Sequence, residues 1–251
     1  MNFGSSLRRA GLVIGLAAGT LHAQSAPSAT AATWFTYGGE HAVSQRLLAL
    51  VDVHVRRDGD LAGWRQLLLR GGLGWATTPT TRVAAGYAYM RSYANAELEV
   101  PATYPEHRLW QMAQLTHTVG LVTLTHRVRL EERWIGDADV AGGEGSSGTA
   151  VRTWRRTTRG RYQLRAAIPF PGTRDRVSLA ASEELFASSA GGATAADQNR
   201  FAVTLGTRVA PTLRMEVGYL NRAAIADGTT RVRDHALLVS FTSTAPLRRA
   251  R

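Results

Sequence analysis

The sequence of 251 residues contains no cysteine and no lysine. Without cysteine the chain cannot form disulfides, zinc–thiolate sites or a cysteine nucleophile. All 30 basic residues are therefore arginine, and against 19 acidic residues they give a formal net charge of +11. The arginines are spread singly along the chain, whereas nucleic-acid binders cluster them on one helix or patch. We therefore expect no nucleic-acid partner.

A hydrophobic run long enough to span a membrane as a helix is also absent. Near the N-terminus, Arg8 and Arg9 precede an apolar stretch from Ala10 to Leu21, and the small residue Ala23 follows. A stretch of about a dozen apolar residues is shorter than the roughly 20 that a spanning helix needs, but it matches a secretory signal. We predict a cleaved signal peptide at residues 1–23 and a small-residue tether at residues 24–32.

Helical periodicity is missing from the rest of the chain, which instead alternates with a period of two. In "THRVRLEERW", Arg127, Arg129, Glu131 and Arg133 share one face, because successive side chains leave a strand on opposite sides. The same alternation marks eleven candidate strand segments, mostly of ten residues or more, while strands of soluble proteins are nearer five or six. The predicted segments are Thr33–His41, Leu47–Arg57, Trp64–Ala76, Arg82–Tyr93, Glu106–His117, Leu121–Ile135, Thr153–Phe170, Val177–Ser188, Asn199–Val209, Met215–Ile225 and Asp234–Thr242.

The connections between these segments alternate between tight turns such as "AVSQR" and longer polar loops such as "GDADVAGGEGSSGTA". Short periplasmic turns and longer extracellular loops are typical of outer-membrane barrels. We predict an all-β fold, a closed antiparallel transmembrane β-barrel over residues 33–244, followed by a basic tail at 245–251. Ten strands from Leu47 to Thr242 fit the alternation, and Thr33–His41 then lies in the lumen or helps to make twelve strands.

Alternation alone does not say which face is inside. A soluble periplasmic ligand-binding barrel would fill its interior with apolar side chains, whereas a membrane barrel turns them to lipid. Strand length, export, loop asymmetry and tryptophans near predicted strand ends favour the bacterial outer membrane. The polar face then lines the lumen, as an ion-pair network or as an anion-preferring pore. The predicted lining residues are Arg56, Arg70, Arg108, Arg127, Arg129, Glu131, Arg133, Arg159, Arg161, Arg165, Glu184, Arg200 and Arg208.

Several short motifs resemble a bacterial outer-membrane family known as domain of unknown function 2490. They are "EHRLWQ" at 106–111, "HRVRLEERW" at 126–134, "SEELF" at 182–186, "NRF" at 199–201, and the Gly-Tyr pairs at 86–87 and 218–219. The resemblance implies a barrel and no assigned activity, so it carries over no catalytic residue. The chain departs from outer-membrane barrels in general by continuing past Phe241 instead of ending on an aromatic residue.

An acyl hydrolase or acyl transferase at the lipid interface is the alternative function, because the chain has serines and the histidines His107, His117, His126 and His235. No nucleophile motif accompanies them, and a serine hydrolase needs its base within hydrogen-bond reach of the serine. No cofactor or metal site is indicated. The expected partners are membrane lipid, the outer-membrane assembly machinery and lipopolysaccharide, whose phosphates suit the arginines near loop ends, Arg57, Arg91 and Arg152.

Overall fold

A computed structural model describes residues 29–95, 100, 102–138, 151–190, 193–226 and 230–247. Every regular element in these ranges is a β-strand. No helix of the described residues is long and apolar enough to cross a membrane. The signal peptide expected at residues 1–23 lies outside the described residues, as does most of the tether and of the basic tail.

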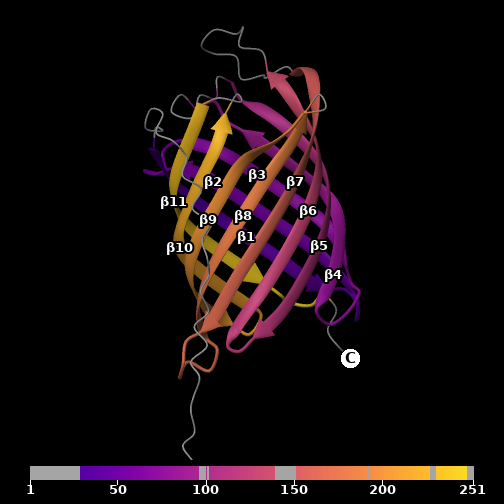
Figure 1. Cartoon of the computed structure of the whole chain (residues 1–251), viewed down its shortest axis with the longest axis vertical. Coiled ribbons are helices and arrows are strands. Elements are labelled where there is room, and N and C mark those ends of the chain that lie inside the picture. Colours follow the sequence, from indigo (N-terminus) through magenta and orange to yellow (C-terminus); the bar gives the residue numbers. More distant parts are fainter. Residues whose placement is uncertain are drawn as a thin grey trace, which may run out of the picture.

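Eleven strands follow one another as an up-and-down meander (Figure 1). They are β1 (Ala29–Ala42), β2 (Leu47–Asp58), β3 (Trp64–Ala76), β4 (Thr81–Ser92), β5 (Tyr104–Val119), β6 (Val122–Ala138), β7 (Val151–Pro169), β8 (Val177–Ala190), β9 (Ala193–Ala210), β10 (Leu213–Ala226) and β11 (Thr230–Ser243). Each of the eleven predicted segments corresponds to one of these strands.

The sheet closes on itself, with β1 between β2 and β11. The prediction of a closed barrel is confirmed, but the predictions of ten strands and of a wholly antiparallel sheet are wrong. The segment around Thr33–His41 is a strand of the wall, which begins four residues earlier than expected, at Ala29. An odd number of strands leaves the first and last running in the same direction, so β1 pairs with β11 in parallel, from Ala29–Arg233 to Gly39–Ser243.

The two faces of the wall differ in the way that the alternation predicts. Large apolar side chains project from the outer face and remain exposed, among them Leu73 (61%), Val128 (56%) and Leu205 (54%). Their neighbours along the strands are buried inside and include many charged groups, such as Arg129 and Glu131. The strands are tilted relative to the long axis of the barrel (Figure 1), as closure requires.

The connections are less asymmetric than the sequence indicates. At the end that holds the turn between β1 and β2, the turns are short, as predicted, and β11 also ends there. Leu247 beyond β11 donates its backbone N–H to the carbonyl of Ala42 at 3.0 Å. At the other end, residues 93–103 separate β4 from β5 and residues 139–150 separate β6 from β7. By contrast, only residues 191–192 separate β8 from β9, and only residues 227–229 separate β10 from β11. The strands there continue into segments that were expected to be loops.

Two of the tryptophans lie inside the barrel, although most tryptophans were expected near the strand ends, where an interfacial girdle would lie. Trp34 and Trp110 are 4% and 2% exposed, whereas Trp64, Trp75 and Trp154 are exposed on the outside. The indole of Trp110 packs over Gly72 and Gly86, which pair across β3 and β4. A Cβ atom at either glycine would collide with this ring and with the backbone of the adjacent strand, so the glycines make room for an interior tryptophan.

Candidate functional site

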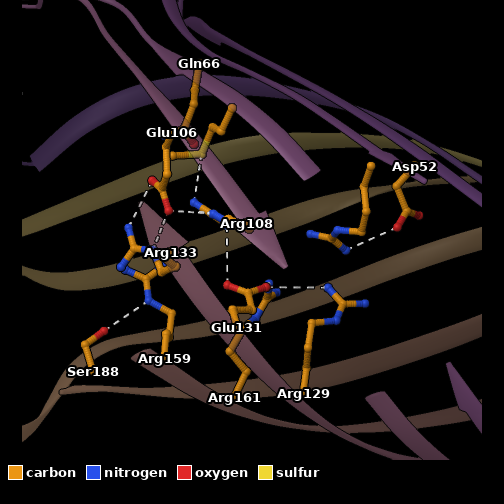
Figure 2. A network of polar contacts seen from close by, with 12 residues as sticks. Asp52, Gln66, Glu106, Arg108, Arg129, Glu131, Arg133, Arg159, Arg161 and Ser188 are labelled. Carbon is orange, nitrogen blue, oxygen red and sulfur yellow. Dashed lines mark hydrogen bonds and ion pairs between the residues drawn. The ribbon is translucent and has the colours of Figure 1, made fainter. Parts of the chain in front are cut away.

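The interior of the barrel is built around three buried glutamates that arginines from several strands surround. Figure 2 shows two of these glutamates, Glu106 and Glu131, with their arginine partners. Glu106 on β5, Glu131 on β6 and Glu184 on β8 are 0%, 1% and 7% exposed. Buried carboxylates of this kind are tolerated only when they are paired and hydrogen-bonded. Each of the three has at least two arginine partners.

Glu106 accepts hydrogen bonds from Arg108 on its own strand and from Arg133 on β6. The Nε of Arg108 lies 2.7 Å from Oε1 of Glu106, and Nη2 of Arg133 lies 3.1 Å from Oε2. Arg133 Nε also donates to Oε1. Arg133 therefore holds the carboxylate through two parallel N–H groups, Nε and Nη2, and this bidentate geometry is the strong form of an arginine–carboxylate pair.

Glu131 connects three arginines. Its Oε1 accepts from Nη1 of Arg161 at 2.7 Å, its Oε2 lies 3.4 Å from Nη1 of Arg108, and Nη1 of Arg129 is 3.9 Å away. Arg161 continues the network because its Nη2 donates to Glu184 at 2.6 Å. Arginine side chains thus link β5, β6, β7 and β8 into one network across the interior.

Further ion pairs lie on either side of this network. Towards the long connections, Arg65 pairs with Asp58 at 2.5 Å and with Asp234 at 3.3 Å. Asp234 also accepts from Arg222 at 2.6 Å. Other pairs involve side chains nearer the turns, namely Arg82–Glu40, Arg165–Glu216, Arg214–Glu216 and Arg70–Asp52.

Arg65 was missed by the sequence analysis because its position in the alternation assigns it to the outer face. The pairing of β2 with β3 shifts between Arg56 and Arg57, whose partners are Gln66 and Trp64, so Arg65 is the extra residue of a bulge. A bulge redirects side chains, and Arg65 is only 6% exposed. Arg222, also missed, lies in β10 within a segment predicted as strand, and only the register places it beside Asp234.

The predicted lining residues are mostly brought together. Arg108, Arg129, Glu131, Arg133, Arg161, Glu184 and Arg200 share the central network, and Arg70, Arg159 and Arg165 form ion pairs with Asp52, Asp197 and Glu216. Arg56 and Arg127 instead donate to glutamine oxygens, those of Gln66 and Gln163. Arg208 is exposed near the end of β9 and lies outside the network.

A cavity of about 140 Å³ lies among these side chains. Eight arginines and His54 are among its lining residues, and none of the carboxylates of the described residues is. The arginines are Arg56, Arg70, Arg108, Arg133, Arg159, Arg161, Arg200 and Arg222. The glutamates pair with the arginines away from the cavity surface, so the cavity is lined by cationic groups alone among its charged residues.

The histidines considered for catalysis lie on the outer face and contact aromatic side chains. The Nδ1 of His126 lies 2.9 Å from the hydroxyl of Tyr162, and His235 is 2.5 Å from that of Tyr219. His107 hydrogen-bonds Tyr87, and His117 stacks on His126 at 5.3 Å between ring centroids. These contacts differ from the Ser–His arrangement of a hydrolase.

Glu131 and Glu132, like Glu183 and Glu184, are neighbours in a strand, so the two carboxylates of each pair lie on opposite faces. Glu131 is buried inside, whereas Glu132 pairs with Arg156 on the outside at 3.1 Å. Glu184 belongs to the network, and Glu183 accepts from the side chain of Asn199. The described residues contain no group of His, Asp and Glu side chains that could hold a metal ion.

Comparison with known proteins gives a family match. A family model described as "Protein of unknown function (DUF2490)" matches residues 31–233. No curated protein matches the sequence. Among solved structures, "Outer-membrane expressed OmpT of Vibrio cholerae" matches with a TM-score of 0.36 and 14% sequence identity. The match covers 74% of this chain and 58% of that chain.

Proposed function

The chain belongs to DUF2490, a family of proteins of unknown function, and we propose that it is a non-enzymatic β-barrel of a bacterial outer membrane. The outer face of the closed sheet carries this proposal. It exposes apolar side chains all round, including Leu69 (44%), Leu109 (53%) and Leu237 (51%). A monomeric soluble protein rarely exposes an apolar surface of this extent, whereas hydrocarbon would bury it.

Closure of the sheet supports the same proposal. In hydrocarbon every backbone N–H and C=O group must find its partner within the protein, and a closed barrel has no unpaired edge. Here the pairing of β1 with both β2 and β11 removes the two edges that the meander would otherwise leave. The soluble ligand-binding barrel, the alternative from the sequence, gives no role to the exposed apolar side chains.

The test is the partition of the mature chain expressed in a Gram-negative host. We expect it in the outer-membrane fraction, extracted only by detergent, with a gel mobility that changes on heating. Mature protein that stays folded and monodisperse in buffer without detergent would overturn the proposal in favour of the soluble barrel.

Inside the barrel, we infer that the arginine–glutamate network has a structural role and fills the lumen. Arginines from four strands lie within ion-pair distance of Glu131 and Glu184, and a barrel of this strand number leaves little space beyond side chains. A narrow anion-preferring channel is the second candidate, and the arginines that line the cavity favour it.

Planar bilayer recordings of the refolded protein under a salt gradient separate these two roles. A filled lumen predicts no discrete conductance steps from bilayers in which folded protein is verified. Steps with an anion-selective reversal potential would instead establish the channel, and Arg161→Gln should then change their selectivity.

Contact with lipopolysaccharide remains a prediction. Arg57 donates to the backbone carbonyls of Leu61 and Ala62, at 2.5 and 2.9 Å, and stacks on Trp64. It therefore lies at the end of the barrel where the longer connections are. The side chain of Arg152 lies outside the described residues. Unchanged lipopolysaccharide retention by Arg57→Ala during purification would count against this contact.

A further inference from the structure

We propose that the central cavity binds a small oxyanion, held by Arg56, Arg200 and the neighbouring arginines of the lining. The inference goes beyond the role of the protein as a membrane barrel, and it does not require that the barrel conducts. The cavity offers at least eight guanidinium groups and no carboxylate of the described residues. Like charges gathered in a poorly solvated interior repel one another, so a bound anion would stabilise this arrangement.

Arg56 and Arg200 are the least compensated of these arginines. Within the described part of the chain, no carboxylate lies within ion-pair distance of Arg56, which donates to the neutral oxygen of Gln66. Arg200 approaches Glu184 only to 3.6 Å, which is too long for a hydrogen bond. Glu184 is already engaged by Arg161 at 2.6 Å. Arg56 therefore has no carboxylate partner among the described residues, and Arg200 has only a distant one.

Aromatic rings hold these two guanidinium groups in place. The guanidinium carbon of Arg56 lies 3.9 Å from the centroid of Trp34, and that of Arg200 lies 5.1 Å from the same ring. Arg200 is also 4.5 Å from the centroid of Phe186. Stacking uses the face of a guanidinium and leaves its N–H donors free at the edge, where a planar fork matches the oxygens of phosphate, sulfate or carboxylate.

Unused hydrogen-bond donors point to the same ligand independently of the charge. The Nε atoms of Arg56, Arg70 and Arg200 are buried and have no hydrogen-bond partner among the described residues. All three arginines line the cavity. A buried donor of a charged group that lacks an acceptor costs free energy, and an oxyanion in the cavity would supply acceptors to several donors at once.

The size of the cavity suits a small ligand. A cavity of about 140 Å³ accommodates an ion of the size of phosphate with a few waters, since a cavity of roughly 10–15 Å³ already holds one water. Because the wall of the sheet surrounds the cavity, the anion would come from solution rather than from a lipid headgroup in the bilayer. Measurement in lipid-free detergent separates these two sources.

The experiment titrates inorganic phosphate into the refolded mature chain in detergent and records thermal unfolding, with sodium chloride at equal ionic strength as the reference. We expect phosphate to raise the melting temperature above that in chloride. Arg56→Gln and Arg200→Gln should each weaken the apparent phosphate affinity at least about tenfold, since a hydrogen bond to a charged group contributes roughly 1.5–3 kcal/mol. Arg56→Lys keeps the charge without the fork and should weaken the affinity to a smaller extent.

Arg82→Gln is the matched control, because Arg82 pairs with Glu40 and does not line the cavity. It should bind phosphate as the parent does. A folded parent that phosphate stabilises no more than chloride would overturn the site, as would an equal loss of affinity in the control. The heat-dependent gel mobility of each sample reports folding separately, so a failure of the anion site is distinguishable from a failure of the barrel.

Discussion

Replacing Glu131 by glutamine tests whether the interior network stabilises the barrel. Glutamine has nearly the same shape, so the change removes a negative charge and little volume. Its amide oxygen can still accept from Arg161, which lies 2.7 Å from Oε1 of Glu131. Its amide nitrogen, however, would face the donor Nη1 of Arg108, now 3.4 Å from Oε2. One acceptor is lost and three arginines lose part of their counter-charge.

The expected cost is large because the site is buried. Glu131 is 1% exposed, and its partners Arg108, Arg129 and Arg161 have side chains that are 5%, 5% and 10% exposed. Removing one partner from a buried ion pair typically costs about 3–5 kcal/mol, since the remaining charge is left without compensation. We expect Glu131→Gln to lower the free energy of unfolding by about 3 kcal/mol, the lower end of this range. Two of the three arginines keep another carboxylate partner, because Arg108 still pairs with Glu106 and Arg161 with Glu184.

The next residue in the chain provides the control. Glu132 lies on the outer face and pairs with Arg156 at 3.1 Å, with side-chain exposures of 28% and 69%. Glu132→Gln leaves the interior carboxylates and their arginine partners unchanged, so it should have the smaller effect on the free energy of unfolding. Equilibrium unfolding in urea, with the protein in lipid vesicles and tryptophan fluorescence as the signal, measures both variants. Equal free energies of unfolding for the two variants would refute the reasoning.

Three further predictions concern other parts of the barrel. Arg129→Leu should destabilise the barrel less than Glu131→Gln in the same assay, because its ion pair is long, at 3.9 Å; an equal or larger loss would contradict this. Valine at Gly86 would collide with the backbone of β3 and with the interior indole, so we expect a loss of about 1–3 kcal/mol and a lower refolding yield, and a parental yield would count against the packing. Cysteines at Phe35 and Val239, partners across the parallel seam, should form a disulfide that changes the mobility of the unfolded chain. Cysteines at Val55 and Val239 should not, unless β2 and β11 are neighbours.

The sequence predicts which residues lie inside the barrel much better than it predicts their partners. The alternation of a strand is a consequence of local backbone geometry, so Arg129, Glu131 and Arg133 could be assigned to one face without a structure. Which carboxylate each arginine meets depends on the stagger of neighbouring strands. Arg161, for example, bridges Glu131 and Glu184 because its strand lies between theirs in a particular register.

Local irregularities limit the prediction further. The bulge that turns Arg65 inward adds one residue to β3 opposite β2, and no residue type in that stretch indicates a bulge. The interior position of Trp110 was not predicted either. Trp110 lies inside because two glycines on adjacent strands face each other and leave space, which is a property of the pairing and not of either strand alone.

The position of β1 was the largest error, and its inward side chains explain its place in the wall. Strands β2 and β11 run in opposite directions and could in principle have closed a ten-strand barrel directly. With β1 between them, Glu40 pairs with Arg82 and Thr30 donates to Asp234 at 2.7 Å. Two guanidinium groups of the cavity lining, those of Arg56 and Arg200, lie over the ring of Trp34. Without β1 these interior groups would lose their partners. An eleventh strand also widens the barrel, since the diameter increases with strand number. The same strand therefore closes the sheet, completes the charge pairing near both ends and provides the width in which the arginine-lined cavity forms.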